Sequence, residues 1–124
     1  NKYINIRNNN FKIFLTVIKK FQKVVFSVGK FNTIKNLSSY AFPIIFYEKK
    51  NLDKFKKLCK KNNIEFRPII SGNLLCQPFL KNKYSGSFPN SNLIHKFGIY
   101  LGNNQFINNK NFLKLEKLLF KFKI

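Results

Sequence analysis

The chain has 124 residues, with 24 basic and 4 acidic side chains and a formal net charge of +20. This length corresponds to one ordinary domain or to one piece of a larger one, and nothing in the composition requires a second domain. The longest continuous apolar run, YAFPIIFY, is far shorter than the roughly 20 residues of a membrane-spanning helix. Two cysteines without a signal-peptide pattern favour a reducing compartment, so we expect a cytoplasmic protein with no membrane partner.

The large positive charge has two explanations. A charge of this size normally indicates nucleic acid as a partner. Arg7 and Arg67 are the only arginines, however, and the abundant residue types Lys, Asn, Ile and Phe have codons rich in A and T. An AT-rich genome would produce this composition without selection for a polyanion, and the lysines are scattered through every segment. We therefore expect nucleic acid to bind only nonspecifically, and most phenylalanines to lie in the core.

The N-terminal part predicts one amphipathic helix and a connection. Residues 24–39 contain VVFSV, a Gly-Lys turn and a Ser pair, which is typical of a connection with a short strand. Because the chain starts at Asn1 without an initiator Met and inside a helical pattern, we expect a fragment of a longer protein. The helix is expected over about residues 8–23, where apolar side chains with helical spacing form one face: Phe11, Phe14, Leu15, Ile18 and Phe21.

A strand–helix–strand unit follows over residues 40–70. YAFPIIFY predicts the first strand, and Pro43 places this strand at an edge or near its own start. IEFRPII predicts the second strand. The two strands are either parallel, across a right-handed crossover, or antiparallel.

The helix between these strands is expected over residues 51–63. Asn51 is the predicted N-cap, Asp53 lies in the predicted first turn, and the Asn62-Asn63 pair is the predicted C-terminal stop. The buried stripe of this helix consists of Leu52, Phe55, Leu58 and Cys59.

Beyond Ser71 the sequence is rich in glycine and proline and predicts loops. SNLIHKF predicts a short helix capped by Ser91, and GIYLG predicts a third strand. The whole order predicts an α+β fold, a small layer of helices against a short mixed or antiparallel sheet. A last helix is expected from Asn108 or Asn109 to the end, with an apolar face formed by Phe112, Leu115, Leu118, Leu119 and Phe122.

Few residues of this sequence could form an active site. One His and two Cys at unrelated positions cannot form a tetrahedral metal site. The sequence has no Ser-His-Asp or Cys-His-Asn arrangement, no phosphate-binding glycine motif and no paired carboxylates. His95 has no orienting partner in the sequence, so a partly exposed structural histidine is favoured over a catalytic base.

Arg67 and the turn after it are stronger candidates. An arginine kept in a lysine-rich chain indicates a need for the planar fork that binds a carboxylate or phosphate through two hydrogen bonds. The alternative is a strand arginine that pairs with a nearby carboxylate. Ser71-Gly72-Asn73 is either a plain turn or a loop whose amide groups line a site.

Two segments carry a resemblance to a known family. IEFRPIISGNLLCQPFL and FPNSNLIHKFGIYLGNNQF resemble the C-terminal part of the DegT/DnrJ/StrS family of PLP-dependent enzymes, which act on nucleotide-linked keto-sugars. That family commonly has an I-E-x-R-P strand, a Gly-Asn turn, an R-Q-P sequence, and a P-N-A-D-x-I-H helix that leads into a G-F/I-Y strand. The similarity includes YAFPIIF and, more weakly, IRNNNFKIF, so it covers nearly the whole chain. The Gly-Asn form is closest to the branch with the 3-dehydratases and related 4-aminotransferases.

The resemblance implies substrate-binding roles for Arg67, Asn73 and Gln77, which match the family's motif residues. Two positions depart from the family pattern. Cys76 stands where the family usually has the Arg of R-Q-P, and Asn92 stands where it usually has the Asp of P-N-A-D. The loss of that arginine removes an expected anion contact or structural contact.

The resemblance also implies a domain organisation and a cofactor. Residues 40–124 would be a C-terminal small domain, as in PLP-dependent aminotransferases, preceded by a helix and connection in residues 1–39. This domain would pack against a large PLP-binding domain and close one side of the substrate cleft. The lysine that binds PLP in the aminotransferases, or the histidine that replaces it in the dehydratases, belongs to that large domain, which is absent from these residues. We therefore expect no catalytic residue and no cofactor in this chain alone.

The sequence supports two alternative functions. The first is a fragment of a PLP-dependent aminotransferase or 3-dehydratase for surface-polysaccharide biosynthesis. Its substrate would be a nucleotide-linked 4-keto-6-deoxy sugar, and the intact enzyme would be a homodimer. The alternative is a small basic non-enzymatic protein that binds nucleic acid, with the steep salt dependence of such binding.

Overall fold

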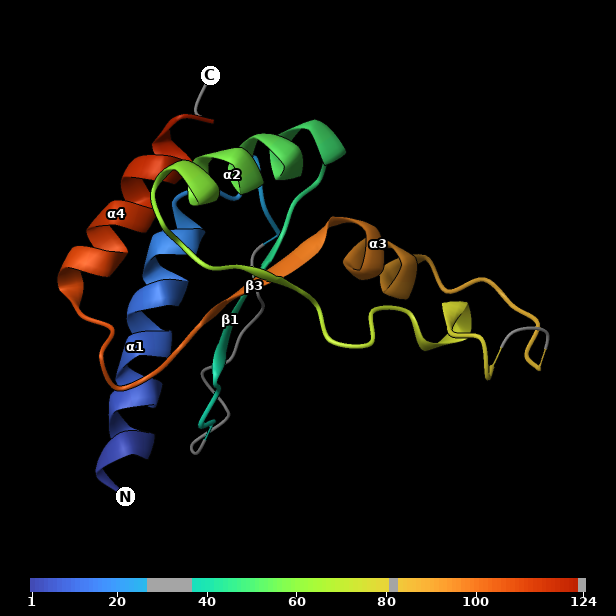
Figure 1. Cartoon of the computed structure of the whole chain (residues 1–124), viewed down its shortest axis with the longest axis horizontal. Coiled ribbons are helices and arrows are strands. Elements are labelled where there is room, and N and C mark those ends of the chain that lie inside the picture. Colours follow the sequence, from blue (N-terminus) through green and yellow to red (C-terminus); the bar gives the residue numbers. More distant parts are fainter. Residues whose placement is uncertain (27–36, 81–82, 123–124) are drawn as a thin grey trace.

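The computed structural model describes residues 1–26, 37–80 and 83–122, and Figure 1 shows how their helices and strands are arranged. Within these residues, four α-helices and a three-stranded antiparallel sheet form an α+β fold, as the sequence predicts. The elements in chain order are α1 (Lys2–Lys19), β1 (Ala41–Ile45), α2 (Lys49–Lys61), β2 (Arg67–Pro68), the 3-10 turn η2 (Leu74–Cys76), α3 (Pro89–Phe97), β3 (Gly98–Gly102) and α4 (Asn109–Phe120).

The sheet places its last strand in the middle, in the order β1-β3-β2. Both outer strands are antiparallel to β3, so β1 and β2 run in the same direction without being neighbours. The connection through α2 is therefore a split β-α-β crossover: the two strands have the parallel direction of the first alternative, but β3 lies between them. Pro43 lies on the edge strand β1, as expected.

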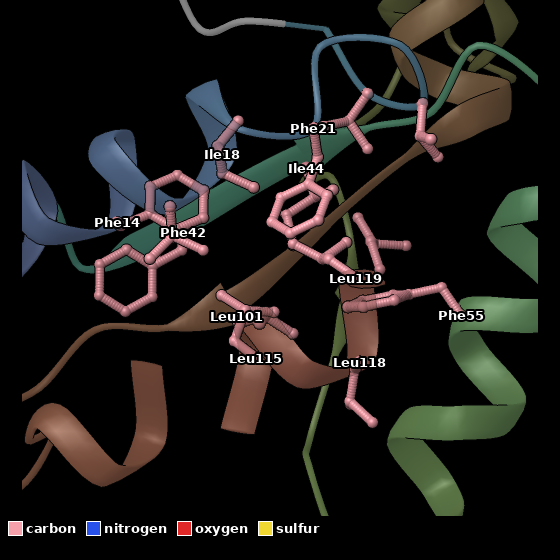
Figure 2. Packing of buried hydrophobic residues seen from close by; sticks show 14 of the residues in the cluster. Phe14, Ile18, Phe21, Phe42, Ile44, Phe55, Leu101, Leu115, Leu118 and Leu119 are labelled. Carbon is pink, nitrogen blue, oxygen red and sulfur yellow. The ribbon is translucent and has the colours of Figure 1, made fainter. Parts of the chain in front are cut away.

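The helices α1, α2 and α4 supply the core that covers one face of the sheet. Along β1, buried and partly exposed residues alternate, as expected for a strand packed on one side. Figure 2 shows the rings of Phe14 and Phe42 side by side, and their centroids are 4.8 Å apart. A second group of rings, Phe46, Phe55 and Phe122, has centroids 5.3 to 6.2 Å apart. Burial of these rings is the main stabilising contribution to the fold.

The predicted helix faces are mostly confirmed. On α1 the predicted residues Phe11, Phe14 and Ile18 are buried and Leu15 is only partly buried, whereas Phe21 is buried in the turn after α1, which ends at Lys19 rather than near residue 23. α1 begins about six residues earlier than predicted, because residues 2–7 contain neither proline nor glycine to stop it. α4 begins at Asn109, as predicted, and the side chain of its N-cap Asn108 accepts a hydrogen bond from the Lys110 N–H. Asn63 has the left-handed conformation, with a φ of 52°, expected of a helix stop.

Several predicted boundaries are wrong. α2 has its N-cap at Glu48 rather than Asn51, so Asp53 lies beyond the first turn. α3 begins at Pro89 rather than after Ser91, because proline suits the first turn of a helix. Only two of the seven residues predicted for the second strand pair with β3. Of the connection predicted for residues 24–39, Val25 forms an isolated bridge with Phe46, and residues 27–36 lie outside the described part.

A long segment between β2 and α3, which we call the arm, consists of residues 69–88, described at 69–80 and 83–88. Figure 1 shows the arm projecting away from the helices α1 and α4. Phe79 and Phe88 are exceptions to the expectation that most phenylalanines lie in the core, and Phe106 and Phe120 are exposed elsewhere. The exposed apolar residues of the arm are Ile70, Leu74, Phe79, Tyr84 and Phe88.

Candidate functional site

A group of polar side chains, which we call the Asn73 cluster, holds the arm against α3. It consists of Asn73, Gln77, Asn92 and His95. Asn73 is buried, and its side-chain oxygen accepts a hydrogen bond from the Leu75 N–H at 3.0 Å. Its Nδ2 donates to Oδ1 of Asn92 at 2.6 Å, and its backbone N–H donates to Nδ1 of His95 at 3.2 Å. The cluster therefore joins residues that lie about twenty positions apart in the sequence.

His95 lies close against the turn that precedes Asn73. A Cβ placed on Gly72 would lie 2.1 Å from Nδ1 of His95, so only glycine fits here. Ser71 and Gly72 both have a left-handed backbone, with φ of 62° and 52°, and this turns the chain sharply at the end of β2. Because Nδ1 accepts a hydrogen bond, the neutral ring carries its proton on Nε2. His95 is exposed, and the partner that orients it is the main chain of this turn.

Gln77 ties the 3-10 turn η2 back to the start of the arm. Its Nε2 donates to the carbonyl oxygen of Ser71 at 3.1 Å. Gln77 is thus held at the turn that Asn73 directly follows, so two of the three residues implied as substrate contacts lie beside the same turn. Both contacts fix the path of the arm, and their predicted role toward a substrate stays a prediction.

Arg67 lies outside the Asn73 cluster, on β2, opposite Tyr100. Its Nη2 and Nε lie 2.7 Å and 2.9 Å from the same oxygen, Oε1 of Glu65. Arg67 therefore pairs with a nearby carboxylate, which is the alternative role that the sequence leaves open for it. The two side chains are 67% and 73% exposed, and such surface pairs contribute only about 0–1 kcal/mol. The guanidinium group can exchange Glu65 for another anion at little cost.

The two departures from the family pattern have different consequences. Asn92 supplies an oxygen acceptor to Asn73, as an aspartate at that position would, so this change preserves the hydrogen bond. Cys76 is exposed in η2 and brings no positive charge. Cys59, by contrast, is buried in α2, and its burial raises the pKa of the thiol from 9.0 to about 11. This agrees with the small core residue that the sequence predicts at Cys59.

A cavity of about 250 Å³ opens between α4, the end of β3 and residues 63–65. Glu65 and Lys114 stand among its polar lining residues, and Nζ of Lys114 donates to the carbonyl oxygen of Asn62 at 2.5 Å. The cavity is separate from the Asn73 cluster. Its apolar walls come from Phe42, Ile64, Leu101, Ile107, Phe112 and Leu115.

Two further findings concern the described residues alone. Their His, Cys, Asp and Glu side chains form no group of three or more that could hold a metal ion. Of the helices in this part of the chain, none is long and apolar enough to cross a membrane.

Asn103 is a buried polar residue that no sequence pattern above indicates. Its Nδ2 donates to the carbonyl oxygens of Arg7 at 3.0 Å and Ser39 at 2.8 Å. Its Oδ1 accepts a hydrogen bond from Asn10 at 3.2 Å, so Asn103 fastens the end of β3 to α1. The only available signal is its position, directly after the strand GIYLG.

The fold defines a class of protein: a small α+β domain with a split β-α-β sheet, a helical layer on one face and a loop arm fastened to a helix. No family model matches this chain, and no curated protein matches it.

Solved structures do match the chain. A GDP-4-keto-6-deoxymannose-3-dehydratase with a trapped PLP-glutamate geminal diamine is similar over 94% of this chain, with a TM-score of 0.73 and 23% identity. The E. coli GDP-4-keto-6-deoxy-D-mannose-3-dehydratase with bound hydrated PLP is similar over 94%, with a TM-score of 0.73 and 21% identity. A DegT DnrJ EryC1 StrS aminotransferase from Brucella abortus is similar over 98%, with a TM-score of 0.75 and 15% identity.

The chain spans 30–31% of the length of these solved chains. The resemblance predicted from the sequence is thus confirmed at the level of the fold. The fold is that of one part of these sugar dehydratases and aminotransferases.

Proposed function

We propose that this chain is the small domain of a PLP-dependent enzyme of the DegT/DnrJ/StrS family. The enzyme would be an aminotransferase or 3-dehydratase that acts on a nucleotide-linked 4-keto-6-deoxy sugar, as a cytoplasmic homodimer in surface-polysaccharide biosynthesis. The observation that carries this proposal is the fold match, which takes in 94–98% of this chain and less than a third of each solved chain. The motif matches at Arg67, Asn73 and Gln77 support the same assignment.

The described residues alone do not form a binding site for PLP. The cofactor needs an imine-forming lysine, or a residue in its place, beside groups for its phosphate and its ring nitrogen. In the described part of the chain, Lys114 is the lysine that lines the cavity, and its ammonium group is bound to the Asn62 carbonyl. We therefore assign PLP to another domain. This chain would contribute substrate contacts and closure of the cleft.

The arm is the surface that we expect to meet that domain. Ile70, Leu74 and Phe79 are 59%, 50% and 63% exposed, and clustered exposed apolar residues mark interaction surfaces. The Asn73 cluster fixes the path of the arm from inside this domain. Arg67, at the base of the arm, would offer its guanidinium group to the phosphates of the nucleotide.

Activity of the whole protein tests the proposal. Protein purified from its natural source, with any domain continuous with this chain, is expected to show the absorbance of bound PLP. It should convert a nucleotide-linked 4-keto-6-deoxy sugar in the presence of glutamate. The 124-residue chain alone should do neither. Turnover by the isolated chain, or a natural protein that holds no PLP, would overturn the proposal.

Substitution of Arg67 tests the assigned contact in the same assay. Arg67→Ala should raise the KM for the nucleotide sugar more than it lowers kcat, because an anion contact to the nucleotide is distant from the reacting carbons. Lys57→Ala, which removes an exposed charge from α2, is the matched control and should change neither constant. An unchanged KM for Arg67→Ala would remove Arg67 from the site.

A further inference from the structure

The exposed side of α2 consists almost entirely of lysine. Seven positions of this helix are exposed, and six of them are lysine, the other being Asp53. The helices α1 and α4 also have seven exposed positions each, but only three are lysine in either helix. Because codons of Asn and Lys are equally rich in A and T, an AT-rich genome accounts for the mixed surfaces of α1 and α4 but not for α2. The six lysines, which we call the α2 basic face, are Lys49, Lys50, Lys54, Lys57, Lys60 and Lys61.

Stability of the helix explains only part of this density. Lys60 and Lys61 lie in the last turn, where positive charge suits the negative end of the helix dipole. Lys50 and Lys54, however, are four positions apart, and like charges at this spacing repel one another on a helix surface. The carboxylate of Glu48 lies 2.8 Å from Nζ of Lys50 and offsets part of this repulsion. An anionic partner would remove the rest.

The α2 basic face is long and curved. The 13 residues of the helix extend over about 20 Å. At 3.6 residues per turn, the six lysines cover roughly 140° of the circumference, on the side away from the buried residues Leu52, Phe55 and Cys59. Lys114 of α4 adds a positive charge at the end of α2, where its Nζ donates to the carbonyl oxygen of Asn62. Figure 1 shows α2 along the top of the molecule, whereas the arm projects to the right.

The chemistry of this face selects among anionic partners. All positions of α2 belong to the described part of the chain, and none of the exposed ones is aromatic or apolar. The face therefore has no ring to stack on the bases of a single strand and no apolar side chain to insert into a lipid surface. Lysine contacts phosphate as a point charge and lacks the planar fork with which arginine recognises guanine. A regular array of phosphates is the partner that these features fit.

We propose that the α2 basic face binds the phosphate backbone of double-stranded nucleic acid without sequence preference. A duplex carries one phosphate charge per roughly 1.7 Å of its axis, so about a dozen lie within the length of α2. These phosphates flank a groove about 12 Å wide, and a curved face reaches both sides of it, whereas a flat lipid surface would meet only the middle of the face. The proposal gives a location to the nonspecific binding expected from the net charge of +20. It is independent of the proposed function.

The salt dependence of this binding follows from counterion release. Each phosphate neutralised by a lysine contributes about −0.9 to the slope of log K against log salt concentration, so six contacts give about −5. The pairing of Lys50 with Glu48 brings this slope closer to −4. The dissociation constant should be on the order of 1–100 μM near physiological salt, as is typical of nonspecific binding.

Fluorescence anisotropy of a labelled short DNA duplex, titrated with the 124-residue chain at about 50 to 200 mM salt, tests the proposal. The α2 variant leaves Lys50 and Lys54 in place, because their side chains contact Glu48 and the Lys121 carbonyl. It combines four substitutions, Lys49→Gln, Lys57→Gln, Lys60→Gln and Lys61→Gln. The matched control removes the same charge from exposed positions of α1 and α4, through Lys2→Gln, Lys12→Gln, Lys19→Gln and Lys110→Gln.

The α2 variant should lower the association constant by about tenfold or more and reduce the magnitude of the slope by about 3, because four phosphate contacts are lost. The control variant should stay within about threefold of the parent, since charges beyond a Debye length of the duplex are largely screened. Circular dichroism should show both variants folded like the parent. If the α2 variant were unfolded, the double variant Lys57→Gln/Lys61→Gln would give the same test, with a change in slope of about 2.

Four outcomes would overturn the proposal. Equal losses for the α2 variant and the control would mean that binding depends on the overall charge alone. A parent chain that leaves the duplex unbound at low salt would exclude the binding itself. Affinities that differ by more than about tenfold between two unrelated duplex sequences would contradict the lack of sequence preference. Tighter, α2-dependent binding to vesicles of phosphatidylserine and phosphatidylcholine would assign the face to a lipid surface instead.

Discussion

In the body of the molecule, formed by α1, α2, α4 and the sheet, rings such as Phe14 and Phe55 are completely buried, whereas in the arm Phe79 is 63% exposed. The body is stabilised by one cluster of buried apolar side chains, to which α1, β1, α2, β3 and α4 all contribute. Because these elements share one core, they should unfold together. The arm is held mainly by the hydrogen bonds of Asn73, Gln77 and His95. Loss of a core ring should therefore unfold the whole domain, while loss of a cluster bond should open only the arm.

Phe55→Ala should have the largest effect of the substitutions considered. The ring of Phe55 is fully buried against Phe46 and Phe122, and its removal leaves a cavity in the core. The free energy of unfolding, measured by urea denaturation, should fall by about 3–5 kcal/mol. Phe79→Ala, the same change in the arm, should stay within about 0.5 kcal/mol. Similar losses for the two variants would contradict the separation of body and arm.

Gly72→Ala should loosen the arm without unfolding the body. The added Cβ would clash with His95 and would require a left-handed backbone that alanine disfavours. The free energy of local opening, measured by hydrogen exchange of the arm amides, should fall by about 1–3 kcal/mol. Gly102→Ala adds the same methyl group where no atom lies within 4 Å, and serves as control. Equal effects of the two changes would mean that the His95 contact does not hold the arm.

Asn73→Ala should have an effect of similar size in the same region. It removes one hydrogen bond to the Leu75 N–H and one to Asn92, at about 0.5–1.5 kcal/mol each. Exchange of the arm amides should increase, and the chemical shifts of His95 should change in NMR spectra. Asn90→Ala changes an exposed asparagine of α3 and should alter neither the exchange of the arm amides nor the chemical shifts of His95. If Asn73→Ala changed neither the exchange of the arm amides nor the chemical shifts of His95, the Asn73 cluster would not be what holds the arm.

The buried thiol of Cys59 should make the stability of the body depend on pH. In the unfolded chain this thiol ionises near 9.0, while in the folded chain its pKa is about 11 because it is buried. Between these values the unfolded state binds fewer protons, so the free energy of unfolding should fall as pH rises from 9 to 11. Denaturation of Cys59→Ala across this window should show a shallower fall, and Cys76→Ala should keep the parent slope. Identical slopes for all three chains would exclude this origin.

Arg67→Lys should have the smallest effect on stability. The exposed pair with Glu65 contributes little, so urea denaturation should show a change within about 0.5 kcal/mol. In the whole enzyme, however, the loss of the planar fork should raise the KM for the nucleotide sugar. Glu65→Gln keeps the arginine and should not raise that KM. A large loss of stability would show that Arg67 is a structural residue of the sheet.

The sequence predicts the body well, because its signals are local. The helical spacing of Phe11, Phe14 and Ile18 records directly which face of α1 is buried. The strand order is not a local property, because β3, which follows the arm and α3 in the chain, lies between β1 and β2 in the sheet. The shortness of β2 also depends on where the turn at Ser71 and Gly72 directs the chain.

The candidate site is less predictable than the body. Asn73 and Gln77 are found from the motif match, but their bonds to Asn92 and the turn depend on how α3 returns to the arm. His95 has no orienting side chain because its partner is a backbone N–H, which no sequence motif identifies. The sequence leaves open whether Arg67 binds the anionic group of a ligand or a nearby carboxylate. In the structure its partner is the carboxylate of Glu65.

The proposed function requires that the body is stable on its own and that a PLP-binding domain covers the arm. Hydrogen exchange, compared between the isolated 124-residue chain and the whole natural enzyme, tests it most directly. The amides of residues 69–80 and 83–88 should exchange more slowly in the enzyme than in the isolated chain, where the Asn73 cluster holds the arm, while those of β3 and α4 should hardly change. Equal exchange of the arm in both proteins would contradict this requirement.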